Sequence, residues 1–406
     1  MNWRAGWLAV LGCLLAGVSH AQTQVIRPAY QFPETNTSGD RAASVQMGDS
    51  PFFFTPYIGV AAGRDSNLFY APNNERASNL YVVSPGFKID ARTEASVVQL
   101  THLSQFGEYT SSSDDDYQDH TTRFQADTAF DQRTFLRFGY DYLHLHDPRG
   151  STDRAVSTRP DVYRLSTPSV TFAYGAPGAQ GRVEAYYSEG HKDYLNNRET
   201  TEASDRLTRE YGGAFYWRVA PKTYALAEVR LDNLLYDDPA SPSSHERRYY
   251  LGVSWEATAA TTGTVKVGRL EKKFDNGELP DFSGSSWEAD ILWAPRTYSK
   301  FDFFTARQTN ESTGLGNFIL TDYYGVNWNH DWSSKVTTGI LARYQTDDYQ
   351  GFDRRDKTTT LGFKVGYRFR RWCTLGAEYD YTHRDSSLDN FDYDKSLYLL
   401  TATLTL

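Results

Sequence analysis

The sequence predicts an all-β fold: a transmembrane, antiparallel up-and-down β-barrel of about 18 strands, with short periplasmic turns and longer extracellular loops; 16 strands is the alternative count. Three observations indicate this fold. The chain opens on an apolar leader, and alternating apolar and polar segments then follow one another from residue 52 onward. The final segment, residues 393–406, alternates in the same way, as expected of a strand that closes the sheet against the first one.

Residues 1–21 are predicted to be a secretory signal peptide. Arg4 precedes an apolar run over 5–18, and small residues stand at 19–21, where cleavage occurs. A lipoprotein signal ending at Cys13 is the alternative, although the apolar run continues past that cysteine. Without Cys13 only Cys373 remains, so the exported chain cannot form an internal disulfide and needs a large closed architecture instead.

Residues 22–51 are polar and show no period, which predicts a flexible periplasmic segment ahead of a barrel over 52–406. The composition agrees with a membrane barrel. The chain has 29 Tyr, 23 Phe and 9 Trp, yet its mean hydropathy is −0.60. A membrane barrel carries its aromatic residues outside, as two girdles, and fills its interior with polar groups. The formal charge of −9 argues against nucleic acid as a partner.

The connections between segments alternate between very short and longer ones, eight of the first kind and nine of the second. This alternation places both ends of the barrel on the short-turn side, as an even-stranded barrel requires. The predicted short turns are 91–94, 131–133, 176–178, 221–222, 259–261, 295–296, 333–334 and 371. The predicted longer loops are 65–77, 111–118, 147–160, 194–206, 237–246, 275–284, 309–317, 349–356 and 385–393.

Within the segments, one parity is apolar and the other charged, as Leu361, Phe363 and Val365 show against Lys364. A charge at the lipid midplane costs roughly 2–4 kcal/mol, so the charged parity is predicted to face the interior. A soluble β-sandwich, the alternative, would need the reverse arrangement. The candidate pore-lining residues are Lys88, Asp90, Arg123, Asp127, Arg137, Asp141, Arg182, Glu184, Glu210, Arg218, Glu228, Arg230, Asp232, Arg248, Glu256, Lys266, Glu288, Asp290, Lys300, Asp302, Arg343, Lys364, Arg368, Arg370, Glu378 and Asp380.

These candidates carry the two signs in balance, whereas a lining of one sign would favour ion selectivity. A balanced lining suits a neutral or weakly charged, hydroxyl-rich solute; alternatively, the charges merely satisfy one another. No connection is clearly long enough to fold inward as a constriction, the best candidates being 147–160 and 194–206. A barrel of this size then leaves a wide channel, which favours a polymeric cargo.

No catalytic or metal site is predicted, and no cofactor. His330-Asp331 and Asp347-Asp348 resemble the Asp and His pairs of outer-membrane proteases, but the predicted turns put them at opposite ends of the barrel. His144 with His146, and the run 114–116, could each hold a metal ion. Strand-end histidines and exposed carboxylates are more often plain polar residues, so the chain is predicted to be non-enzymatic.

Several strings resemble the putative β-barrel porin 2 family: Tyr57-Ile-Gly59, Arg64 to Tyr70, Ser84 to Phe87, Tyr117 to His120, and Leu145 to Ser151. Members of that family are often encoded beside exopolysaccharide or exosortase genes. The resemblance therefore implies polysaccharide export across the outer membrane of a Gram-negative bacterium. The chain ends on a leucine where outer-membrane barrels usually carry an aromatic residue, which weakens the insertion signal.

The expected function is accordingly an outer-membrane channel for a secreted exopolysaccharide. Its expected surroundings are outer-membrane lipid and lipopolysaccharide, and its expected partners are the polysaccharide cargo and periplasmic or inner-membrane export proteins. Two alternatives remain open. One is a general or substrate-selective diffusion porin for small solutes, and the other is a non-conducting surface barrel that mediates adhesion.

Overall fold

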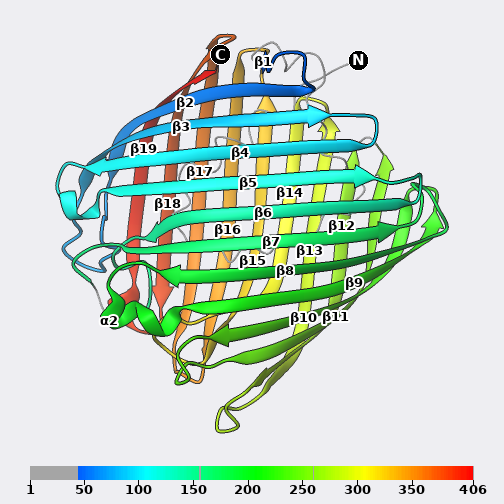
Figure 1. Cartoon of the computed structure of the whole chain (residues 1–406). Helices are drawn as coiled ribbons and strands as arrows, with labels where there is room; N and C mark the ends of the chain where they lie inside the picture. The colour runs from blue at the N-terminus through cyan, green and yellow to red at the C-terminus, as the bar shows by residue number, and fades with distance from the viewer. Residues whose placement is uncertain (1–43, 155–156, 259, 406) are drawn as a thin grey trace.

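The computed structural model of the protein describes residues 44–154, 157–258 and 260–405. Strands β2 to β19 form one closed antiparallel sheet, in which each strand pairs with the next along the chain (Figure 1). The last strand closes the ring by pairing with β2, from Leu397 opposite Asp65 to Thr405 opposite Tyr57. The predicted barrel of 18 strands is confirmed. The predicted signal peptide, and residues 22–43 of the segment after it, lie outside the described residues.

The barrel strands are twelve to sixteen residues long, enough to cross a bilayer when tilted. They are β2 Phe52–Asp65, β3 Ser78–Arg92, β4 Ser96–Tyr109, β5 Tyr117–Ala129, β6 Thr134–Asp147, β7 Asp161–Tyr174, β8 Gly181–Tyr194, β9 Arg206–Ala220, β10 Thr223–Tyr236, β11 Ser244–Thr258, β12 Thr261–Phe274, β13 Phe282–Arg296, β14 Ser299–Asn310, β15 Phe318–Asp331, β16 Val336–Gln350, β17 Arg355–Arg370, β18 Cys373–Ser386 and β19 Tyr393–Thr405. A two-residue strand, β1 (Val45–Gln46), pairs with β2.

Eight connections at one end of the barrel and nine at the other alternate along the chain as predicted, but their lengths overlap: the loop 351–354 has four residues and the turn 175–180 has six. The turn after β5 shows why such a short connection is stable. Asp131 accepts hydrogen bonds from the backbone N–H groups of Arg133 and Thr134, at 2.6 and 2.8 Å. These bonds, led by the one from Arg133, lower the pKa of Asp131, which therefore stays ionised as an acceptor in the turn.

The longer loops carry the helical segments: η2 Ser113–Asp115, α2 Arg198–Thr201, η3 Glu202–Ser204 and η4 Asp389–Phe391. Among the described residues, every helix is too short or too polar to cross a membrane.

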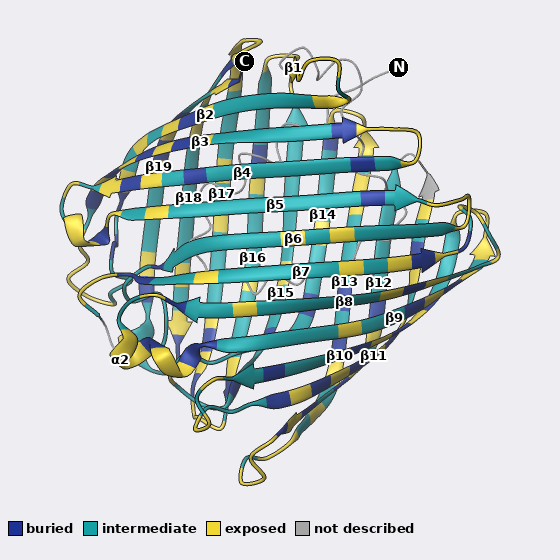
Figure 2. Cartoon of the chain, viewed as in Figure 1, coloured by how far each residue is buried: buried dark blue, intermediate teal, exposed yellow. Residues whose placement is uncertain are grey.

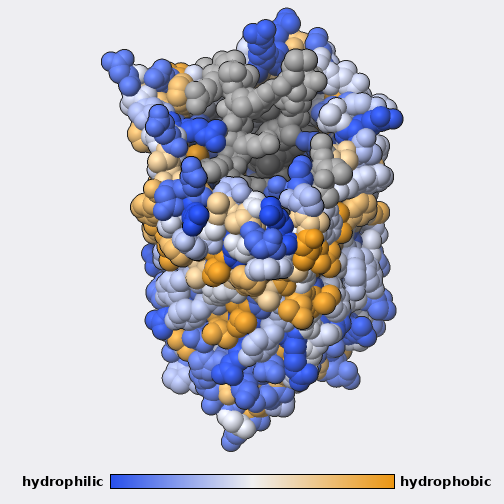
Figure 3. Space-filling model, turned by 90° about the vertical axis from the view of Figure 1, so that its right-hand side faces the viewer, coloured by the Kyte–Doolittle hydropathy of each residue, from blue (hydrophilic) through white to orange (hydrophobic). Residues whose placement is uncertain are grey.

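The two faces of the sheet differ sharply in composition. Along β9 to β11, buried and exposed residues alternate with a period of two (Figure 2). Away from the strand ends the exposed positions are mostly apolar, as at Leu251 and, on β19, Leu400, which are 68% and 70% exposed. Apolar side chains gather in a band across the middle of the visible face, with hydrophilic ones above and below (Figure 3). An apolar exterior of this extent is stable in hydrocarbon and not in water.

Exposed aromatic side chains border this band on both sides, as expected for the girdles of a membrane barrel. On the long-loop side they include Tyr81, Phe106, Tyr211, Tyr249 and Tyr398. On the short-turn side they include Phe130, Tyr174, Trp217, Trp293, Tyr298, Trp332, Tyr367 and Trp372.

Candidate functional site: the barrel interior and its long-loop mouth

The strand register places nearly all of the 26 charged residues singled out in the sequence on the face opposite the apolar one, which is the interior of the closed sheet; Arg370 is an exception, because it follows an irregularity in β17 and stands opposite the outward Cys373. Several of these residues form an ion pair with a nearby residue of opposite charge, either on the same strand or on the neighbouring one. Arg137 contacts Asp127 on the neighbouring strand at 2.5 Å, and Lys88 contacts Asp90 at 3.5 Å. The structure thus brings many of these residues together as ion pairs, consistent with the alternative that they satisfy one another.

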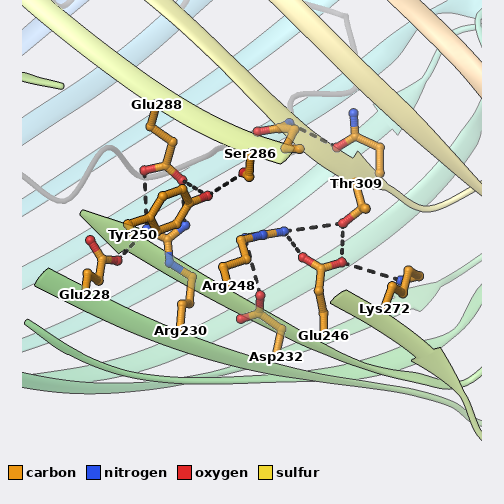
Figure 4. Close-up of polar contacts among 12 residues, drawn as sticks. Glu228, Arg230, Asp232, Glu246, Arg248, Tyr250, Lys272, Ser286, Glu288 and Thr309 are labelled. Atoms are coloured by element: carbon orange, nitrogen blue, oxygen red, sulfur yellow. Dashed lines mark hydrogen bonds and ion pairs between the residues drawn. The ribbon is translucent and has the colours of Figure 1, made fainter. Parts of the chain in front are cut away.

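The densest cluster, the central charge network, joins Glu228, Arg230, Lys266 and Glu288 from β10, β12 and β13. Figure 4 shows three of them, Glu228, Arg230 and Glu288. Arg230 lies 2.7 Å from Glu228 and 2.9 Å from Glu288, and Lys266 contacts both carboxylates. The hydroxyl groups of Tyr250 and Ser286 form a hydrogen bond of 2.7 Å in which either can be the donor. The Tyr250 hydroxyl oxygen also lies 3.2 Å from the Glu288 carboxylate. Side chains three strands apart can meet in this way only where the sheet curves sharply.

A second network lies beside the first and reaches the long-loop end. Arg248 contacts Asp232 at 3.3 Å and also pairs with Glu246 (Figure 4). Lys272 contacts Glu311, in the loop between β14 and β15, at 3.0 Å. Together the two networks fill the interior along β10 to β13, since their charged side chains are almost all 10% exposed or less.

Other parts of the interior are more open to water. The side chains of Arg123 and Asp141, on β5 and β6, are 43% and 27% exposed, and they lie 3.8 Å apart. Arg368, near the short-turn end of β17, is exposed as well. On β3 and β19, by contrast, the inward Leu80 and Leu399 are buried. Exposure therefore varies around the interior, which residue alternation alone does not reveal.

The loop between β6 and β7, residues 148–160, reaches the opposite wall and is here named the crossing loop. Its Asp153 lies 2.7 Å from Arg354, which stands between β16 and β17, half the ring away. The Tyr349 hydroxyl donates to Asp153 at 2.9 Å, and the backbone N–H of Asp153 donates to Thr313 at 3.1 Å. This contact corrects the expectation that no loop folds inward.

Arg354 is held rigidly for this contact. Its side chain is 0% exposed and forms two parallel hydrogen bonds to Asp356, at 2.9 and 2.6 Å. It also stacks on the rings of Tyr349 and Phe391, at 4.3 and 3.6 Å from their centroids. Asp153, Tyr349, Arg354 and Asp356 are here named the latch. A buried, bidentate arginine pair of this kind is geometrically specific.

The base of the crossing loop is tied down too. Arg149 donates to Asp115 at 2.7 Å and to Ser112 at 3.1 Å, and it lies over the ring of Phe69. The hydrogen bond to Asp115 raises the pKa of the Arg149 guanidinium, which keeps it charged. At the other side of the loop, Arg154 donates to Asp161 at 2.6 Å. The loop is thus fixed at its base and at its tip.

The remaining candidates do not form a reaction centre. His330 lies near the short-turn end of β15 and Asp347 near the long-loop end of β16. The pair His330-Asp331 therefore does not meet the pair Asp347-Asp348. His144 lies beside His120 in the register, whereas His146 contacts Asp119 at 2.9 Å. Asp115 is buried against Arg149 and is not a solvated carboxylate.

Among the described residues, a metal-competent grouping occurs at Asp193, Asp205 and Asp237. Asp205 is engaged by Arg198 at 2.6 Å and Asp193 by Arg164 at 2.8 Å. Both carboxylates therefore already have cationic partners within the chain.

Three solved structures with a similar fold are distant from this chain in sequence. Pseudomonas aeruginosa OpdO is 12% identical, covers 87% of this chain and 97% of its own, and has a TM-score of 0.48. P. aeruginosa OccK2 (OpdF), solved in complex with glucuronate, is 8% identical, covers 87% of this chain and 98% of its own, and has a TM-score of 0.49. The FrpB iron transporter of Neisseria meningitidis is 11% identical over 81% of this chain, with a TM-score of 0.43; this chain spans 62% of its length.

The curated proteins contain no match to the sequence. Residues 42–406, which include every barrel strand, match the model of one family. The chain belongs to the putative beta-barrel porin 2 family.

Proposed function

We propose that the protein is a diffusion channel for small polar solutes in the outer membrane of a Gram-negative bacterium, with its long loops outside the cell. The observation that carries this proposal is the crossing loop, which spans the long-loop mouth and is latched to the opposite wall. The charge networks along β10 to β13 narrow the path further. A restricted, water-accessible lumen lined by both signs of charge suits small hydrophilic solutes better than a polymer.

Export of a polysaccharide is the second candidate, supported by the mixed-charge lining and by the family resemblance. A polymer would need the crossing loop to leave the mouth, which requires breaking the contact between Asp153 and Arg354. With the latch intact, the protein would pass small solutes but not a polymer, and this difference separates the two functions.

The test is conductance of the purified full chain in planar bilayers, together with liposome swelling in sugars of increasing size. The wild type is expected to conduct steadily and to admit monosaccharides and disaccharides while excluding dextrans. Asp153→Ala is expected to raise the conductance and the size limit, because it releases the loop tip. Asp353→Ala, which removes an exposed carboxylate next to Arg354, is the matched control and should change neither.

A wild type and an Asp153→Ala variant that both fail to conduct would overturn the channel proposal and favour an adhesion barrel. Loss of surface polysaccharide in a deletion strain, with sugar uptake unchanged, would favour export instead.

A further inference from the structure

The lipid-facing wall carries a hollow of about 680 Å³ over β8 to β12, on the outside of the part of the barrel that holds the central charge network. Its sides are apolar side chains of neighbouring strands, among them Phe215, Tyr249, Leu251 and Val267. Its floor is shallow because the outward positions Gly213 and Ala227 have little or no side chain. It lies between Tyr211 and Tyr249 on one side and Trp217 on the other, and so within the apolar band.

A cluster of cations adjoins the hollow toward the long-loop end. Arg269 lines the hollow itself and stands directly opposite Tyr249 in the register. Arg247 and Lys273 occupy neighbouring outward positions on β11 and β12, and both are exposed. The one outward carboxylate among them on these two strands is Glu271, 3.3 Å from Arg269. This part of the rim therefore carries a surplus of positive charge.

Near the long-loop end of other strands, several outward cations are paired with carboxylates. Arg164 is matched by Asp193, and Arg307 is matched by Asp322. On β17 and β18, Lys357 faces Asp385 at 3.8 Å. The cationic surplus next to an apolar hollow is thus a local feature of β11 and β12 and not a general property of the rim.

We propose that this wall binds one molecule of lipid A, with an acyl chain in the hollow and a phosphate between Arg247, Arg269 and Lys273. Burial of a chain in the hollow removes apolar surface from contact with mobile lipid and fixes the chain's position. Guanidinium groups bind phosphate through charge-assisted, bidentate hydrogen bonds. The choice of lipid A rests on the proposed orientation, because the long loops then border the outer leaflet.

The test uses native mass spectrometry of the full chain, released from detergent after addition of lipid A, phosphatidylglycerol or phosphatidylethanolamine, one at a time. The wild type is expected to retain lipid A and to lose the other two at equal activation. The double variant Arg247→Gln, Arg269→Gln is expected to bind lipid A roughly tenfold more weakly or worse, since two charge-assisted contacts are lost.

Filling the hollow tests the acyl-chain part separately. A side chain at Gly213 meets only the Glu184 carbonyl, at 3.6 Å, so Gly213→Leu leaves the barrel intact while occupying the floor. Ala227→Leu serves as a second filling variant. Both are expected to lower lipid A retention severalfold. Lys357→Gln and Ala377→Leu make the same chemical changes on a distant wall and should retain lipid A as the wild type does.

Equal retention of lipid A by wild type, charge variants and filling variants would overturn the proposal, as would equally tight retention of phosphatidylglycerol. Conductance of the same variants separates this result from the channel proposal. Loss of lipid A with unchanged conductance supports the lipid site alone, and a non-conducting wild type that still retains lipid A refutes only the channel.

Discussion

At the scale of single residues, the interior is stabilised by charges that depend on each other. Arg230 and Lys266 share the carboxylates of Glu228 and Glu288, and all four side chains are about 5% exposed or less. Desolvating such groups is costly, and only their mutual contacts offset the cost. Removing one of the four side chains therefore leaves a buried charge without a partner. The loss of folding stability is then larger than the stabilisation that the lost ion pair contributed.

Glu288→Ala is expected to destabilise the barrel by about 3–5 kcal/mol, the usual result of breaking a buried ion pair. Equilibrium unfolding by urea in lipid vesicles measures this change. Lys357→Ala removes a charge from a pair that is more than half exposed on both sides, and should cost less than about 1 kcal/mol. Equal costs for the two variants would show that the central charge network is hydrated.

Sequence alternation predicts the interior face of these residues but not their partners. Arg230 and Glu288 are 58 residues and three strands apart, and no local pattern connects them. Their contact depends on how sharply the closed sheet bends at β10 to β13, which is a property of the whole ring. For the same reason, the sequence predicts a balanced lining but not which parts of it are buried.

At the scale of elements, the turns and loops were predictable because turn residues interrupt the alternation at regular places. What escaped prediction is the direction of the crossing loop. Thirteen residues running out and back reach roughly 20 Å at 3.3 Å per residue, so length alone does not exclude a crossing. The sequence feature that bears on this direction is the segment Leu145 to Ser151, in which Gly150 follows Arg149. The segment alone does not predict the direction, because the loop's contact partner is Arg354, more than 200 residues away.

Gly150 is expected to control the path of this loop. Its φ is +79°, and a Cβ there would lie 2.1 Å from the carbonyl oxygen of Phe69. Gly150→Ala should therefore displace the loop base, raise the single-channel conductance and make it noisier. Planar bilayer recording measures both effects.

Gly178→Ala provides the matched control for that prediction. It has a similar φ of +74° but lies in a short turn, where a Cβ meets only Arg218 at 3.8 Å. It should lose about 1 kcal/mol or somewhat more of stability through backbone strain and leave conductance unchanged. Increased conductance in both variants would mean that backbone strain, and not the contact with Phe69, displaces the loop.

At the scale of the whole molecule, the sequence predicted most of the architecture. A period of two, sustained over the chain from β2 to β19, leaves one way to keep charges out of lipid, which is a closed ring with its apolar face outside. Val365 and Leu375 illustrate it, because they lie on the exterior opposite Thr338 and Tyr367 in the register. The hollow over β8 to β12 was not predictable, since it depends on small residues meeting across several strands.

The two mouths differ in charge, and this difference makes a prediction about ion flow. The nine long loops carry seventeen acidic and six basic residues, whereas the eight short turns carry two acidic and four basic ones. A cluster of one sign at a channel mouth raises the local concentration of counter-ions. Because the interior pairs its charges, the acidic long-loop mouth is expected to dominate and to make the open channel prefer cations.

Reversal potentials under a salt gradient should therefore give a cation-to-anion permeability ratio above one. The preference should weaken as ionic strength rises from about 0.1 to 1 M, because the Debye length falls from roughly 10 to 3 Å. Replacing Asp237 and Asp238 with asparagine should lower the ratio, since both stand in an acidic loop, while replacing Glu94 with glutamine at the short-turn end should lower it only slightly or leave it unchanged. A wild type that prefers anions would show that the exposed arginines of β17, and not the loops, set the selectivity.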